Sequence, residues 1–155
     1  MVTMKKAINY GKKATQMFVL ANFVYIGGFV MLANNIIAKL SKSLENQSEL
    51  EIVLEQERKK LDIDDSTKIR ARISENQDED ANAQRMNSNY YKITLSPKYH
   101  TISTLKHELY HIADGHCDNL GKIPNSRAGR LKKIFKYLYI YEPQAVLYSM
   151  TGIKL

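Results

Sequence analysis

Apolar and polar positions divide the chain into one long uncharged segment and a series of shorter periodic elements. Residues 14–38 form a run of 25 positions without a charged side chain. That length is enough for a helix across a hydrocarbon layer about 30 Å thick, so we predict a single transmembrane helix. Asn22, the Asn34-Asn35 pair and the Gly27-Gly28 pair weaken its apolar character. A buried helix or an uncleaved signal-like segment is the alternative.

In the next segments the spacing of apolar residues is first that of a helix and then that of a strand. Residues 44–61 are rich in Glu, Gln and Lys and predict a helix whose apolar stripe is formed by Leu50, Val53, Leu54 and Leu61. We interpret residues 39–65 as a helical stalk that packs on the domain formed by residues 66–155. Apolar and charged side chains then alternate over residues 67–73, which predicts a short half-buried strand.

A second strand is predicted just before the richest part of the sequence. Residues 75–89 contain almost no apolar side chain, so we expect an exposed loop there. Tyr90 to Leu95 is rich in aromatic and branched residues and ends at Ser96-Pro97, as strands do. If this strand lies at a sheet edge, it can pair with an extended peptide. An ordinary interior strand is the alternative.

The C-terminal third predicts helices. After a loop over residues 119–125, Ser126 can cap a helix that begins at Arg127. Its expected apolar face is formed by Leu131, Ile134, Phe135 and Leu138. Tyr137, Tyr139 and Tyr141 alternate as in a strand, which leaves the end of this helix open. Pro143 fits a break or a fresh start, and residues 145–150 predict a last helix up to Gly152. The fold class is therefore α+β.

Charge is distributed unevenly and bears on the partners. Residues 1–13 carry four lysines and no acid, which the positive-inside rule associates with a cytoplasmic tail. We therefore expect a single-pass membrane protein that contacts lipid through residues 14–38, with its folded domain on the non-cytoplasmic side. Residues 122–155 carry seven basic side chains and one acidic one. We interpret them as a solvated helix face, and a membrane span argues against nucleic acid as a partner.

One five-residue run carries the chemistry: His107-Glu108-Leu109-Tyr110-His111. On a helix, His107 and His111 lie on one face a single turn apart, so both imidazoles can bind the same zinc ion. Glu108 lies about 100° around the helix, where it can act as general base on a water bound to that ion. The flanking apolar residues form a separate face, and Gly115 can end the helix.

Two histidines leave a tetrahedral zinc site short of one protein ligand. Glu142 is the favoured candidate, because it lies at the start of a helix that can pack antiparallel to the first. His116 is the alternative, and Asp114 or Asp118 are weaker candidates that can instead accept a hydrogen bond from a histidine ring. Cys117 is also near, although a single cysteine in such a place is more often a small buried side chain.

These residues resemble a known family. The run HELYH on one helix and Glu142 in a Glu-x-x-Ala context on the next are similar to the gluzincins, in particular the minigluzincins and related membrane-tethered peptidases. The resemblance covers about residues 66–153. It implies a small zincin-like domain, a Zn²⁺ cofactor, His107, His111 and Glu142 as ligands, and Glu108 as catalytic base. It also implies a tyrosine that stabilises the oxyanion, for which we consider Tyr148 and Tyr141.

The expected function is that of a zinc-dependent metallopeptidase acting on peptide or protein substrates. Zinc would polarise the scissile carbonyl and lower the pKa of its bound water towards ~7, while Glu108 would transfer the proton to the leaving amine. The alternative is a membrane-bound zincin-like sensor or scaffold with weak or no activity.

Overall fold

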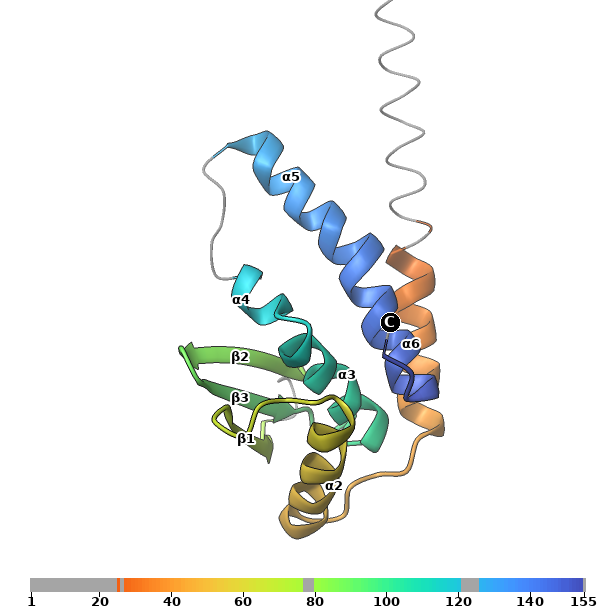
Figure 1. Cartoon of the computed structure of the whole chain (residues 1–155). Helices are drawn as coiled ribbons and strands as arrows, with labels where there is room; N and C mark the ends of the chain where they lie inside the picture. The colour runs from red at the N-terminus through yellow and green to blue at the C-terminus, as the bar shows by residue number, and fades with distance from the viewer. Residues whose placement is uncertain (1–24, 26, 77–79, 121–125, 155) are drawn as a thin grey trace, which may run out of the picture.

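The computed structural model describes residues 25, 27–76, 80–120 and 126–154 (Figure 1). A helix over residues 27–40 comes first. It is followed by α2 (Gln47–Lys60), β1 (Lys68–Ile73), β2 (Asn82–Asn87), β3 (Tyr90–Leu95), α3 (Ile102–Ala113), α4 (His116–Leu120), α5 (Arg127–Lys136), the π-helical turn η1 (Tyr137–Tyr141) and α6 (Glu142–Thr151). This mixture of a small sheet with packed helices confirms the α+β class.

The sheet has three strands in the order β1-β3-β2. β3 pairs parallel with β1 and antiparallel with β2, so it is the central strand. The prediction of a strand at Tyr90–Leu95 is confirmed, and of the two positions considered for it the structure shows the interior one, because both of its sides are paired. The sheet-edge position does not hold for this strand, since β1 and β2 form the two edges of the sheet (Figure 1).

β2 also corrects the predicted loop over residues 75–89. Its sequence Asn-Ala-Gln-Arg-Met-Asn has no apolar alternation, and its last four side chains are exposed. Pairing with β3 satisfies the backbone groups on one side of this segment whatever its side chains are. An edge strand whose side chains are mostly exposed carries little hydrophobic pattern, so its sequence resembles that of a loop.

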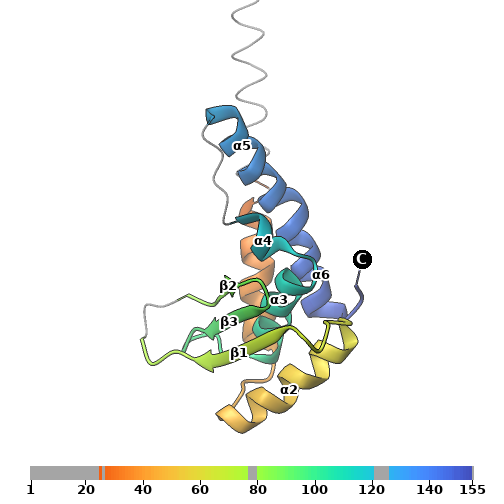
Figure 2. The same ribbon diagram turned by 60° about the vertical axis from the view of Figure 1, so that its left-hand side comes forward.

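One hydrophobic core joins the sheet to α2, α3 and α6. α3 covers a face of the sheet, and α2 lies beside β1 (Figures 1 and 2). The core residues with no measurable exposure are Leu44, Leu50, Leu61, Ile93, Leu95, Leu105, Leu109, Tyr110 and Ala145. The helix interpreted as a stalk therefore contributes leucines to the same core as the sheet.

Local signals place the helix that carries the HELYH run. Thr101 caps the start of α3, where its hydroxyl accepts a hydrogen bond from the backbone N–H of Thr104. The chain before α2 also holds this end, since Leu44 donates its N–H to the carbonyl of His100 at 2.8 Å and Ile102 donates to Lys42 at 3.0 Å. α3 ends at Ala113, and Gly115 adopts a left-handed φ of 65° that only glycine reaches without strain.

The C-terminal helices differ from expectation in two ways. Ser126 caps α5 as predicted, but no residue of α5 is buried, and three residues of its predicted apolar face, Leu131, Ile134 and Phe135, are exposed. Residues 137–141 are helical rather than strand-like, and α5, η1 and α6 follow one another without a break. α6 ends at Gly152 in the left-handed conformation, as predicted.

Two other predictions fall partly outside the residues that the structure describes. The predicted loop over residues 119–125 begins inside α4, and residues 121–125 lie outside the described part. The basic tail 1–13 and most of the first half of the predicted transmembrane segment 14–38 also lie outside it. Among the described residues, none of the helices has both the length and the apolar character needed to cross a membrane.

Candidate metal centre

α3 brings His107 and His111 onto one buried face. The two side chains are 5% exposed each, and their rings meet edge to face with centroids 4.8 Å apart. Their Nε2 atoms lie 3.1 Å from each other. One helical turn separates the two residues, as the four-residue spacing requires. Both ring nitrogens are thus directed at the same point.

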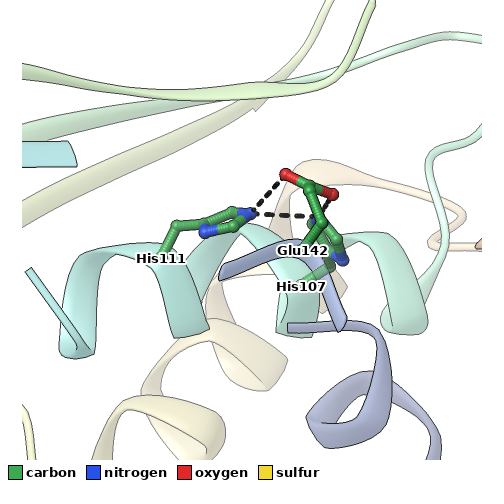
Figure 3. Close-up of side chains that lie close together, drawn as sticks. All are labelled: His107, His111 and Glu142. Atoms are coloured by element: carbon green, nitrogen blue, oxygen red, sulfur yellow. Dashed lines mark hydrogen bonds and ion pairs between the residues drawn. The ribbon is translucent and has the colours of Figure 1, made fainter. Parts of the chain in front are cut away.

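Glu142 completes a triangle of donor atoms from the start of α6 (Figure 3). Its carboxylate oxygens lie 3.4 Å from Nε2 of His107 and 3.2 Å from Nε2 of His111. Zinc binds nitrogen and oxygen ligands at 2.0–2.2 Å, so neighbouring donors of a tetrahedral site are about 3.3 Å apart. The distance between the two Nε2 atoms is near that value, and so is the distance from each of them to one oxygen of the Glu142 carboxylate, Oε2 for His107 and Oε1 for His111. The donor set His, His, Glu fits zinc.

Electrostatics favour a negative carboxylate in this triangle. Burial disfavours the charged form of Glu142, but the adjacent rings of His107 and His111, with help from Tyr137, hold its pKa well below the usual range. Burial also works against a charged His107, yet the carboxylates of Glu142 and Glu108 outweigh it and raise its pKa. A positive charge at this point is stabilised by the surrounding groups, which is what a metal ion needs.

Glu108 lies beside the triangle without belonging to it. Its side chain is buried, and burial raises the pKa of its carboxyl group. The backbone N–H of Ala83 donates a hydrogen bond to it, so the edge strand β2 fixes its position. The carbonyl of the same Ala83 accepts from Sγ of Cys117 at 3.7 Å. Both backbone groups of Ala83 thus attach β2 to the helices that surround the site.

The other predicted ligand candidates lie elsewhere. His116 lies behind His111 on the side away from the triangle, with its Nδ1 at 2.8 Å from Nδ1 of His111. Asp118 accepts from the hydroxyl of Tyr91 at 2.9 Å and pairs with Arg85 at 3.0 Å. Asp114 is close only to His116 among the candidates. Cys117 is buried, and burial raises the pKa of its thiol to about 12, which disfavours the thiolate that a metal needs.

The two tyrosines considered for oxyanion stabilisation have other partners. Tyr148 is 1% exposed and donates its hydroxyl to Glu57 at 3.0 Å, and Tyr141 stacks on the ring of His116 with centroids 3.7 Å apart. The hydroxyl of Tyr148 is thus used by α2 in this structure.

The tyrosine nearest the triangle is one that sequence reasoning missed. Tyr137 stacks on the ring of His111, with an angle of 17° between their planes, and its hydroxyl donates to Glu142. Residues five apart on an α-helix point about 140° away from each other. In η1 the N–H of Glu142 bonds to the carbonyl of Tyr137, a five-residue spacing that brings the two side chains together. Only knowledge of the π turn could have indicated this pair.

The arrangement is that of a buried donor triangle with a carboxylate beside it, built from α3, η1 and α6 and touched by β2. Compared with protein-family profiles, with curated proteins and with solved structures, the chain matches none.

Proposed function

We propose that this protein is a zinc-dependent peptidase in which His107, His111 and Glu142 hold the metal. One observation carries the proposal: the Nε2 atoms of His107 and His111 lie 3.1 Å apart, and each lies within 3.4 Å of one oxygen of the Glu142 carboxylate, close to the donor spacing of a tetrahedral zinc site, with the carboxylate of Glu108 next to them. The gluzincin resemblance of the HELYH run and Glu142 points to the same ligands and the same base.

Each residue has a distinct role in the proposed reaction. When bound, zinc would supply Lewis acidity to the substrate carbonyl and to a water molecule. Glu108 takes a proton from the attacking water and delivers it to the nitrogen of the leaving amine as the C–N bond breaks. Burial raises the pKa of Glu108, which makes it a better proton acceptor than an exposed glutamate. Tyr137 keeps the carboxylate of Glu142 directed at the metal.

The edge strand β2 suits an extended peptide substrate. It pairs with β3 on one side only, and its residue Ala83 contacts Glu108. The backbone groups of Ala83 itself are engaged by Glu108 and Cys117, so a peptide that adds to this edge as a further strand would pair with the residues beyond Ala83 and lie next to the catalytic carboxylate. This moves the proposed substrate contact from Tyr90–Leu95 to Asn82–Asn87.

One observation favours the alternative of a zincin-like sensor or scaffold with little activity. The site residues are closely covered, with His107 and His111 5% exposed and Glu108 8% exposed. A substrate carbonyl needs access to this point, so catalysis requires the cover to move. Activity measurements therefore have to separate metal binding from turnover.

The decisive experiment compares Glu108→Gln with wild type. The full chain, purified with zinc, is incubated with a mixed peptide pool, and cleavage is followed by mass spectrometry while bound zinc is measured by atomic absorption. We expect Glu108→Gln to keep the metal and to lose at least about a hundredfold in cleavage rate, because proton transfer contributes about 10²–10⁴-fold. Glu51→Gln, at an exposed position of α2, is the matched control and should cleave as wild type does.

Ligand variants test the metal itself. His107→Ala and Glu142→Ala should lose zinc, whereas a zinc content equal to that of wild type in both would contradict the proposed site. Cleavage by Glu108→Gln at the wild-type rate would contradict the assigned base and leave the metal site standing. A wild type that binds zinc and cleaves nothing in the pool would support the sensor or scaffold.

A further inference from the structure

A further histidine, His116, lies directly behind the proposed ligand His111. His116 is fully buried, and its Nδ1 lies 2.8 Å from Nδ1 of His111. On the other side of the ring, Nε2 of His116 lies 2.6 Å from a carboxylate oxygen of Asp114. Three titratable side chains thus form a line from the metal centre to the surface, where the carboxylate of Asp114 is 37% exposed.

The direction of each ring fixes where its proton resides. Nε2 of His111 faces His107 and Glu142, so as a metal ligand it carries no proton, and the neutral ring is protonated at Nδ1. That N–H points at Nδ1 of His116, which must then be the acceptor. His116 is therefore protonated at Nε2, the atom that faces Asp114. The two atoms are in contact, although their geometry is not that of a hydrogen bond, so the effect of Asp114 on this ring is electrostatic.

We infer that His116 and Asp114 are positioning residues for the metal centre, which hold His111 in the tautomer and orientation that presents Nε2 to the ion. This inference rests on the proposed metal site. An acceptor on the far nitrogen of a ligating histidine raises its basicity as well as fixing its ring. Here the acceptor is itself a histidine, and the negative charge of Asp114 strengthens it. The role replaces the alternative in which His116 is the third ligand.

The surroundings hold His116 in one place. Its ring stacks on Tyr141 with centroids 3.7 Å apart, and Tyr110 meets it from another side at 5.9 Å. The left-handed Gly115 turns the chain back after α3, so that residue 116 returns to the level of residue 111. A ring clamped in this way loses little further freedom when it accepts the hydrogen bond from His111.

Two substitutions separate the hydrogen bond from the packing. His116→Phe keeps a buried ring that can stack on Tyr141 but removes the acceptor. His116→Asn loses the ring but places an amide oxygen near the position of Nδ1. The readout is the dissociation constant of zinc for the full chain, measured by competition with a chromogenic chelator, beside thermal unfolding of each variant without metal.

We expect His116→Phe to weaken zinc binding by about 10–100-fold, the usual effect of losing such a partner, and His116→Asn to recover part of the loss. Thermal stability should follow the opposite order, with His116→Phe above His116→Asn. Asp114→Asn should weaken zinc binding more than Asp118→Asn, which removes a neighbouring carboxylate that pairs with Arg85 instead.

Each other outcome has a defined meaning. Zinc binding by His116→Phe as tight as by wild type, or tighter than by His116→Asn, would overturn the inference and reduce His116 to a packing residue. Complete loss of zinc in both variants, equal to that of His107→Ala, would make His116 a ligand and overturn it as well. If His107→Ala binds zinc as wild type does, the proposed metal site fails, and the inference fails with it for that separate reason.

Discussion

At the scale of single residues, one buried carboxylate is paired with side chains from elements that are far apart in the chain. Glu57 of α2 is 3% exposed and receives the hydroxyl of Tyr148 at 3.0 Å, 91 residues further on. Lys106 of α3 lies 3.8 Å from the same carboxylate. A buried carboxylate is expensive unless it is hydrogen-bonded, so these contacts join α2, α3 and α6.

Tyr148→Phe should therefore lower the free energy of unfolding by about 1–3 kcal/mol, because it leaves an oxygen of Glu57 without this donor. Denaturant unfolding measures the loss, and Tyr25→Phe, at a ring 77% exposed, should change nothing.

The same pair predicts a pH dependence. Burial, together with the bond to Glu57, raises the pKa of Tyr148 above its ordinary value of 10.0. Its contribution is then complete below pH 10 and is lost as the pH rises above that value. The difference between wild type and Tyr148→Phe should shrink above pH 10, and an equal difference at all pH values would contradict this account.

At the scale of elements, the turn between α3 and α4 decides how the metal centre is supported. Gly115 has a φ of 65°, and a Cβ added there meets no atom within 4 Å. Any cost of a side chain at this position thus comes from the backbone, whose left-handed conformation costs other residues about 1–2 kcal/mol.

Gly115→Ala should accordingly destabilise the protein by about 1 kcal/mol, and Gly115→Asn by less, since Asn tolerates this conformation better. Gly28→Ala is the matched control with the opposite sign. Gly28 lies inside a helix, and a Cβ there also meets nothing within 4 Å, so alanine should stabilise the helix by about 0.5–1 kcal/mol. Equal effects of the two substitutions in denaturant unfolding would show that φ is not the cause.

At the scale of the whole molecule, large apolar side chains remain exposed on two helices, the helix of residues 27–40 and α5. In the helix of residues 27–40 they are Phe29, Met31, Leu32, Ile36 and Leu40, and on α5 they are Leu131, Ile134 and Phe135. Exposed apolar surface on this scale marks an interaction surface, and α5 adds basic side chains and no acidic one. A bilayer anchored through residues 14–38 would account for both.

We therefore expect the full chain to stay with membranes after an alkaline carbonate wash and to be released by detergent. A span of 25 uncharged residues is retained under these conditions, because burying its apolar surface in hydrocarbon outweighs any loss of charge contacts. Fractionation and immunoblotting measure the outcome. Release by high salt alone would assign the contact to α5, and recovery in the wash fraction would contradict a transmembrane segment.

Local patterns were enough for most helices and two strands. Caps at Thr101 and Ser126, turns at Gly115 and Gly152, and regular apolar spacing are signals that neighbouring residues create, so they can be read without the fold. β2 was missed for the opposite reason, since a polar edge strand is stabilised by its partner and not by its own side chains. The exposed face of α5 misled for a similar reason, because periodicity predicts an apolar face but not what covers it.

The sequence by itself determined the HELYH run on one helix, because a spacing of four residues fixes the relation of His107 to His111. It also favoured Glu142 over His116. Only the tertiary structure decided that the carboxylate of Glu142 reaches both rings, that Tyr137 joins it through a five-residue turn, and that His116 stands behind His111. Those contacts depend on how α6 packs on α3 and how the chain turns at Gly115, and no local pattern contains that information.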